Sequence, residues 1–374
     1  MNARAVRRLL AATPIDREAE ERTWAVVRAA FDEREPVRAG PHRPVRLALA
    51  LAAVAVGVGA AALSPPGRAV VNAVRRSIGI EHAAPALFRL PAAGRLLVAG
   101  EGGAWVIAGD GSTRRLGSYS QASWSPHARY VVAATQNELF ALEPNGRVHW
   151  QLARPAIRFP RWGGTHTDTR IAYLTTSRLH VVAGDGTGDV DAEGLPAAAP
   201  VAPAWQPTTL DRHVLAYVTT RGRVTVLDPD RGNVSWISSR YADPRVLAWS
   251  PDGRTLALAT RADVVLFAAV TGHARVVPVA GVRALAFAPG GRLAVVRGHS
   301  VLLLEGSTAQ VLFVAPARLA GLAWSPDGRW LLTSLPGADQ WIFVQARGGH
   351  RVLAVSHIAA QFGSAFPTVS GWAP

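Results

Sequence analysis

From residue 91 onward, short apolar runs alternate with turns rich in Gly, Pro and Asp, which predicts short β-strands rather than helices. One string recurs in this region: an aromatic residue, a Ser-Pro-Asp-Gly-Arg turn and an apolar strand such as 255–259. Complete or altered copies begin at Trp124, Trp162, Trp205, Trp249, Phe287 and Trp324, at spacings of 37 to 44 residues. This spacing accommodates four strands per copy, which is the period of a β-propeller blade.

The two ends of the repeat region each carry half of a copy. The chain ends with Gly-Trp-Ala-Pro at 371–374, and the complementary strand follows Gly94. Joining these halves adds one blade to the six internal copies. We therefore predict an all-β fold over 91–374, a seven-bladed β-propeller closed by pairing of the N- and C-terminal strands. Closure leaves no blade edge open for pairing with another chain.

The aromatic residue of each copy stands directly before a tight turn that Pro and Gly favour. A large ring at the same place in every blade would fill the space between adjacent blades. The alternative is a platform on which a ligand stacks. We favour packing, because the ring recurs whatever the neighbouring loops contain.

The string Trp-Ser-Pro-Asp-Gly-Arg at 249–254 and 324–329, with the strand that follows it, resembles the WD-repeat-like blades of TolB-type propellers. The resemblance covers 91–374 and implies the fold but no single activity, because propellers serve many roles. Two strings, 142–150 and 227–236, are similar to the outer hairpins of quinoprotein propellers. No residues match the cofactor-binding set of that family, so we expect a Gly turn followed by a packing aromatic.

A different pattern precedes the repeats. Residues 47–67 contain no charged side chain over 21 positions, which predicts one transmembrane helix, with a buried helix as the alternative. Residues 1–46 predict a helical arm, and 68–90 a juxtamembrane helix or linker. Arginines are more frequent before the span than after it, which favours a cytoplasmic N-terminus. We expect a single-pass protein of the cytoplasmic membrane with its propeller outside the cytoplasm.

The net charge of +14 suggests an anionic partner, and all 40 basic residues are arginine. Of these, 30 follow residue 46 together with 19 acidic residues, so most of the excess lies on the propeller side of the predicted membrane, away from chromosomal DNA. The charge then indicates an anionic envelope ligand or codon bias rather than nucleic acid. The absence of cysteine excludes disulfides and thiolate chemistry.

One set of arginines recurs at matching positions of the blades. Arg158, Arg245 and Arg283 stand four residues before the motif aromatic, and Arg318 stands six before it. In a propeller these positions lie where the innermost strand of each blade begins, at the mouth of the central channel. Several guanidinium groups there would bind carboxylate or phosphate, which makes these four residues the candidate binding cluster. The alternative is ordinary solvated loop charge.

Other candidate chemistry is weak. The acidic residues of 185–193 alternate as in some calcium loops, but Pro196 stands where the final ligand would be, and a solvated hairpin loop explains them better. The histidines show no metal-ligand spacing, and no nucleophile elbow is present. We expect no catalytic residue, no metal and no cofactor.

The pattern as a whole favours a non-catalytic binding or scaffolding module for a protein or an anionic envelope ligand. The layout of a short arm, one span and an external domain also resembles membrane-bound anti-sigma factors, with the propeller as sensor, although the zinc motif of that family is absent. A propeller enzyme is the third possibility.

Overall fold

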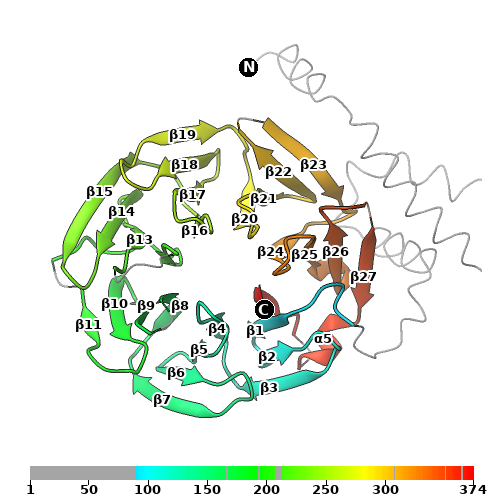
Figure 1. Cartoon of the computed structure of the whole chain (residues 1–374), viewed down its shortest axis with the longest axis horizontal. Helices are drawn as coiled ribbons and strands as arrows, with labels where there is room; N and C mark the ends of the chain where they lie inside the picture. Colours follow the sequence, from blue (N-terminus) through cyan, green and yellow to red (C-terminus); the bar gives the residue numbers. More distant parts are fainter. Residues whose placement is uncertain are drawn as a thin grey trace, which may run out of the picture. The chain divides into compact units, whose positions relative to one another are not determined.

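The computed structural model describes residues 89–374 except 166, 193, 208–211, 307, 350 and 364. This part of the chain forms seven four-stranded antiparallel sheets arranged around one axis (Figure 1), so the predicted seven-bladed all-β propeller is confirmed. The predicted arm (1–46), the predicted span (47–67) and nearly all of the linker (68–90) lie outside the described residues. Among the residues that are described, no helix is both long enough and apolar enough to cross a bilayer.

We number the blades in chain order and list their strands from the axis outward. Blade 1 is β28 (Thr368–Ala373), β1 (Arg95–Gly100), β2 (Gly103–Ile107) and β3 (Thr113–Gly117). Blade 2 is β4 (Gln121–Trp124), β5 (Val131–Ala134), β6 (Glu138–Leu142) and β7 (Val148–Ala153). Blade 3 is β8 (Ile157–Gly164), β9 (Thr169–Thr175), β10 (Arg178–Ala183) and β11 (Val190–Asp191). Blade 4 is β12 (Ala204–Trp205), β13 (Leu215–Val218), β14 (Arg223–Asp228) and β15 (Asn233–Arg240).

The last three blades follow the same order. Blade 5 is β16 (Val246–Trp249), β17 (Thr255–Ala259), β18 (Val264–Ala268) and β19 (Ala274–Val277). Blade 6 is β20 (Val282–Phe287), β21 (Leu293–Arg297), β22 (Ser300–Glu305) and β23 (Thr308–Val314). Blade 7 is β24 (Ala320–Trp324), β25 (Trp330–Leu335), β26 (Gln340–Gln345) and β27 (Val352–Ser356), with the short helices η2 (Pro336–Ala338) and α5 (Ile358–Gln361).

The ring closes within blade 1. The C-terminal strand β28 pairs antiparallel with β1, with Leu96 opposite Trp372 and Ala99 opposite Thr368. In Figure 1 the red C-terminal strand lies beside the blue-green start of the propeller. This pairing confirms the predicted closure, and it joins strands from opposite ends of the described chain.

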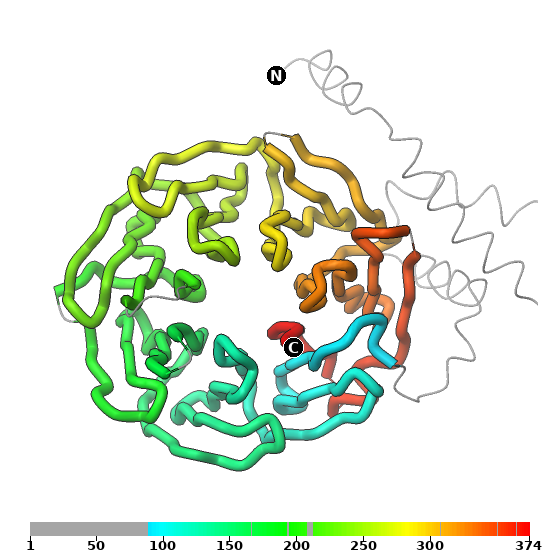
Figure 2. The backbone as a smooth tube through the Cα atoms, viewed as in Figure 1, coloured from blue at the N-terminus to red at the C-terminus, as the bar shows by residue number. Residues whose placement is uncertain are grey.

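Two faces of the ring follow from this topology. We call the face at which the innermost strands begin the N-face, and the face at which they end, with the motif turns, the C-face. Each chain passage from the outermost strand of one blade to the innermost strand of the next lies at the N-face, because four antiparallel strands end on the face where the first began. Figure 2 traces these passages around the ring. The N-face also carries the turn between the second and third strands of every blade.

The motif aromatics pack between blades, as predicted. Trp205, Trp249 and Trp324 are mostly buried, and each donates its Nε1–H to the carbonyl oxygen directly before the aromatic of the preceding blade. These acceptors are Arg161 at 2.9 Å, Ala204 at 3.0 Å and Ala286 at 3.0 Å, respectively. The rings therefore fasten the innermost strands to one another while they fill the core.

The hairpins at 142–150 and 227–236 also serve packing. On β7 and β15, Trp150 and Trp236 donate Nε1–H to backbone carbonyls in the outer turn of the next blade, at 2.9 Å and 2.8 Å. In the same two turns, Gly186 and Gly272 have positive φ, and an added Cβ would lie 2.8 Å from the neighbouring indole. The glycine and the aromatic are thus two halves of one contact between blades.

Candidate functional site

The four predicted arginines all lie on the N-face. Arg158 and Arg283 are the second residues of β8 and β20, Arg245 directly precedes β16, and Arg318 lies two residues before β24. The last three belong to consecutive blades, whereas Arg158 is separated from Arg245 by blade 4. The structure therefore brings Arg245, Arg283 and Arg318 onto one arc of the face and leaves Arg158 outside it.

The arginines of this arc differ in their partners. Arg245 donates to the carboxylate of Asp243 on its own loop, with Nη2 to Oδ2 at 2.7 Å, so this carboxylate partly neutralises its charge. Arg283 and Arg318 are exposed, and neither has a hydrogen bond or ion pair within the described part of the chain. Their guanidinium groups are available to a ligand.

Two further arginines, which the sequence reasoning missed, adjoin this arc. Arg261 lies on the turn between β17 and β18, where its carbonyl accepts a hydrogen bond from Gly281 N at 2.8 Å, two residues before Arg283. Arg297 ends β21, and the adjacent carbonyl of Gly298 accepts a bond from Leu319 N at 2.9 Å, beside Arg318. Both side chains are exposed, and the structure shows no polar partner for them among the residues that it describes. The sequence pattern that could have identified them is their shared position at the end of the second strand of a blade: Arg297 is the last residue of β21, and Arg261 lies two residues after β17.

We call the exposed set Arg261, Arg283, Arg297 and Arg318 the N-face arginine cluster. Blades 5 to 7 hold it on two neighbouring pairs of backbone segments that hydrogen bonds fasten together. Unpaired like charges on a rigid support favour an anionic partner, because binding relieves their mutual repulsion and the side chains lose no existing bonds.

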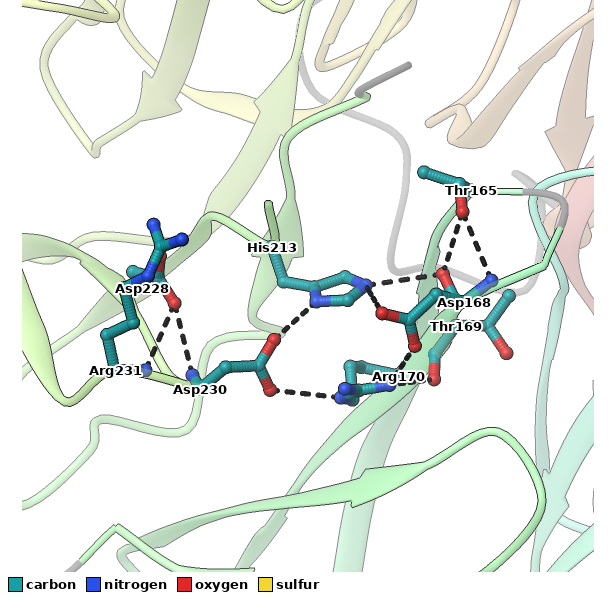
Figure 3. A network of polar contacts seen from close by, with 8 residues as sticks. All are labelled: Thr165, Asp168, Thr169, Arg170, His213, Asp228, Asp230 and Arg231. Atoms are coloured by element: carbon teal, nitrogen blue, oxygen red, sulfur yellow. Dashed lines mark hydrogen bonds and ion pairs between the residues drawn. The ribbon is translucent and has the colours of Figure 1, made fainter. Parts of the chain in front are cut away.

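A second polar cluster lies on the C-face between blades 3 and 4 (Figure 3). His213, only 2% exposed, contacts the Asp230 carboxylate through Nδ1 at 2.5 Å and the Asp168 carbonyl through Nε2 at 3.2 Å. Arg170 bridges the same two aspartates, with Nε 3.0 Å from Asp230 Oδ1 and Nη1 bonded to Asp168. Asp228 shapes the turn that carries Asp230 by accepting its backbone N–H at 3.1 Å.

The charges of this cluster stabilise one another. Burial raises the pKa of Asp230, but the hydrogen bonds from His213 and Arg170 outweigh burial and hold that pKa below its ordinary value. Burial lowers the pKa of Arg170, but the bonds to Asp230 and Asp168 outweigh burial, so that pKa lies above its ordinary value. Since both nitrogens of His213 have partners, the imidazole has no position left for proton transfer to a substrate. The cluster fastens two blades together.

The candidate calcium segment is divided among different partners. Asp185 Oδ1 accepts bonds from the backbone N and the hydroxyl of Thr187, at 3.0 Å and 2.7 Å. Asp189 accepts from Arg154 Nη2 at 2.6 Å and from the Tyr173 hydroxyl at 2.7 Å. Burial raises the pKa of Tyr173, and the bond to Asp189 raises it further. Within the described ranges, no three acidic or histidine side chains are placed to hold a metal ion.

One comparison with known protein families agrees with the architecture. A family model described as "WD domain, G-beta repeat" matches residues 298–344, which span parts of blades 6 and 7. With the seven sheets, this match supports a WD-repeat-like propeller. No curated protein matches the chain. Among solved structures, hydrazine synthase of Kuenenia stuttgartiensis aligns at 15% identity and a TM-score of 0.46, over 60% of this chain and 75% of that one.

Proposed function

We propose that this protein is a membrane-anchored, extracytoplasmic and non-catalytic binding module, whose propeller holds a protein or an anionic envelope ligand on its N-face. The observation that carries the proposal is the N-face arginine cluster, four exposed guanidinium groups without partners in the described chain. Propellers with WD repeats commonly act as protein-binding scaffolds. A closed ring is already ordered before binding, so the backbone that carries these guanidinium groups loses little conformational entropy when a partner binds.

An acidic peptide is the partner that best fits this face. Carboxylates spaced along a backbone can reach two pairs of arginines at once, and each guanidinium can accept a carboxylate in a bidentate geometry. Such an interaction depends on salt, because the cluster is exposed and the Debye length is about 8 Å at physiological ionic strength.

The binding role can be tested with poly-L-glutamate as the probe and the full chain as the receptor. The double variant Arg283→Gln/Arg318→Gln should lower affinity about tenfold, since it removes two charge-assisted contacts. The matched control is Arg114→Gln/Arg275→Gln, which removes the same net charge from exposed positions on the outer strands β3 and β19. Equal weakening by both pairs would show that net charge alone attracts the probe and would refute the cluster.

Membrane anchoring is a separate part of the proposal and rests on the uncharged segment 47–67. The full chain should remain in membranes washed at high pH, and a chain lacking 47–67 should not. Protease added outside spheroplasts should digest the propeller of the full chain. Recovery of the full chain in the soluble fraction would contradict this part and leave the binding test unaffected.

A further inference from the structure

A cavity of about 450 Å³ opens on the C-face between blades 2 and 3, away from the N-face arginine cluster. Its walls come from the motif turns of both blades, from the start of β7 and from the turn after β10. The volume lies within the range of about 300 to 1,000 Å³ that is usual for small-molecule sites.

Two other junctions between blades carry an arginine, here called a plug, that the junction of blades 2 and 3 lacks. At the junction of blades 6 and 7, Arg292 lies 5.2 Å over the Trp324 ring and donates to Gly328 O at 3.1 Å in the next motif turn. At the junction of blades 1 and 2, Arg95 lies 5.2 Å over Trp124 and donates to Ala128 O at 2.9 Å. Each arginine both covers an aromatic ring and closes the gap to the following turn.

In blade 2 the corresponding residue is Tyr130, directly before the residue that pairs with the motif aromatic. Its ring stacks on Trp162 of blade 3, with centroids 5.9 Å apart and planes 16° from parallel. The phenol therefore covers the indole, but it makes no hydrogen bond to the described residues of the next motif turn. That turn is also longer, because eight residues separate Trp162 from its partner Ile171, against six between Trp324 and Leu331.

Trp162 lines the cavity and is only 8% exposed. Its Nε1 is buried and has no hydrogen-bond partner among the described residues, and the same is true of Trp124, whose junction has the arginine plug. Because this nitrogen has almost no accessible surface, the Trp162 ring gives the cavity an apolar wall rather than a donor.

The remaining lining shows what kind of ligand would fit. Arg129 is exposed at the rim and has no hydrogen bond or ion pair with any residue in the described ranges, so it can meet one negative charge. The hydroxyl groups of Thr167 and Thr169 suit a ligand rich in hydroxyls, and the rings of Tyr130 and Trp150 suit its apolar face. Asp185 also lines the wall, and its carboxylate would accept ligand hydroxyls and repel a dianion such as phosphate.

The wall on the blade 3 side is held in place from behind. Asp168 N donates to Thr165 Oγ1 at 3.1 Å, and Thr165 N donates to Asp168 O at 2.8 Å. Asp168 is in turn bound by Arg170 and His213 on the side facing blade 4, as Figure 3 shows. Thr165 uses its hydroxyl within the turn, and these bonds fix the segment that carries Thr167 and Thr169, which lowers the entropic cost of binding.

We infer that this cavity binds an acidic sugar unit, a hexuronic acid. The sugar carboxylate meets Arg129, the sugar ring packs on Tyr130 and Trp150, and the sugar hydroxyls contact Thr167, Thr169 and Asp185. This site lies on the opposite face from the N-face arginine cluster, and the inference does not depend on the proposed function of that cluster.

The test is calorimetric titration of the full chain with D-glucuronate, D-glucose and D-glucose 6-phosphate as probes. Glucuronate should bind in preference to both other sugars. Arg129→Gln should weaken glucuronate binding about tenfold, because it removes the charge-assisted contact with the sugar carboxylate. The matched control is Arg114→Gln, which removes the same charge from an exposed position on the outer strand β3 and should bind as the wild type does.

Several results would overturn the inference. These are no glucuronate binding at millimolar concentration, equal binding of glucose, preference for the phosphate, or unchanged affinity in Arg129→Gln. Poly-L-glutamate binding should be the same in Arg129→Gln as in the wild type, which separates failure at this cavity from failure at the N-face.

Discussion

The motif turns allow the cost of a positive φ to be separated from the cost of a steric clash. Gly253 and Gly328 occupy the same place in blades 5 and 7, with φ of +66° and +65°. A Cβ built on Gly328 meets its nearest atom, Pro289 Cδ, at 3.5 Å, which is ordinary contact. A Cβ built on Gly253 lies 2.8 Å from Pro207 O and 3.2 Å from Gln206 Cγ.

Two alanine substitutions should therefore differ in a defined way. In Gly328→Ala only the positive φ disfavours alanine, so this substitution should lower the free energy of unfolding by about 1 kcal/mol. Gly253→Ala adds a clash with a backbone carbonyl and should cost about 2 to 3 kcal/mol. The clash also displaces Gln206, whose Nε2 donates to Gly253 O at 2.5 Å and joins blades 4 and 5.

The assay is urea unfolding of each full-length variant beside the wild type, with thermal unfolding as a check. For a chain of this size, 1 kcal/mol corresponds to a shift of about 2 °C in melting temperature. Blade 2 supplies the internal control, since Ala128 already occupies the matching place at a φ of +53°. Ala128→Gly removes the strain of a positive φ at alanine but also removes a buried methyl group. The two effects oppose each other, so the free energy of unfolding should change by less than about 1 kcal/mol. Equal losses in Gly253→Ala and Gly328→Ala would refute the clash, and a gain in either would refute the backbone argument.

Three other perturbations test the ring and its junctions. Deleting 366–374 removes β28 and exposes the edge of β1, so calorimetry should show a large fall in melting temperature, and an unchanged value would contradict closure. Arg292→Gln loses the contact with Trp324 and the bond to Gly328 O, and chemical unfolding should show a loss of about 1 to 2 kcal/mol, against none for the exposed Arg254→Gln. Because the folded pKa of Asp230 lies below the ordinary value of 3.8, its stabilisation is present above that pH and disappears as pH falls through the folded pKa. Asp230→Asn should therefore be less stable than wild type by about 1 kcal/mol near neutral pH, and the gap should narrow below pH 4 in acid titrations of unfolding; a constant gap would show that this carboxylate carries no net charge effect.

The repeat pattern alone was enough to predict the blades. Strand length, turn chemistry and the spacing of the motif aromatics are local properties, and each appears directly in the order of residues. The closure was predictable too, because half a motif at each end of the propeller leaves two strands without partners. The arginines at blade starts could be aligned by counting back from the aromatic, which placed Arg283 and Arg318 on one face.

Contacts between blades were not predictable in this way. Arg261 and Arg297 adjoin Arg283 and Arg318 only because the turn of one blade hydrogen-bonds to the passage into the next. His213 meets Asp230 and Asp168 from 17 and 45 positions away, across a junction whose loop lengths follow no repeat.

The sequence by itself thus determined how many blades form, where each begins and how the ring closes, because these depend on periodicity and turn residues. Only the tertiary structure decided which blade junctions are plugged and which remain open. An arginine covers the next aromatic ring at the junctions of blades 1 and 2 and of blades 6 and 7, whereas a tyrosine covers it at the junction of blades 2 and 3. Such differences have no local signature, since their effect appears only when two blades face each other.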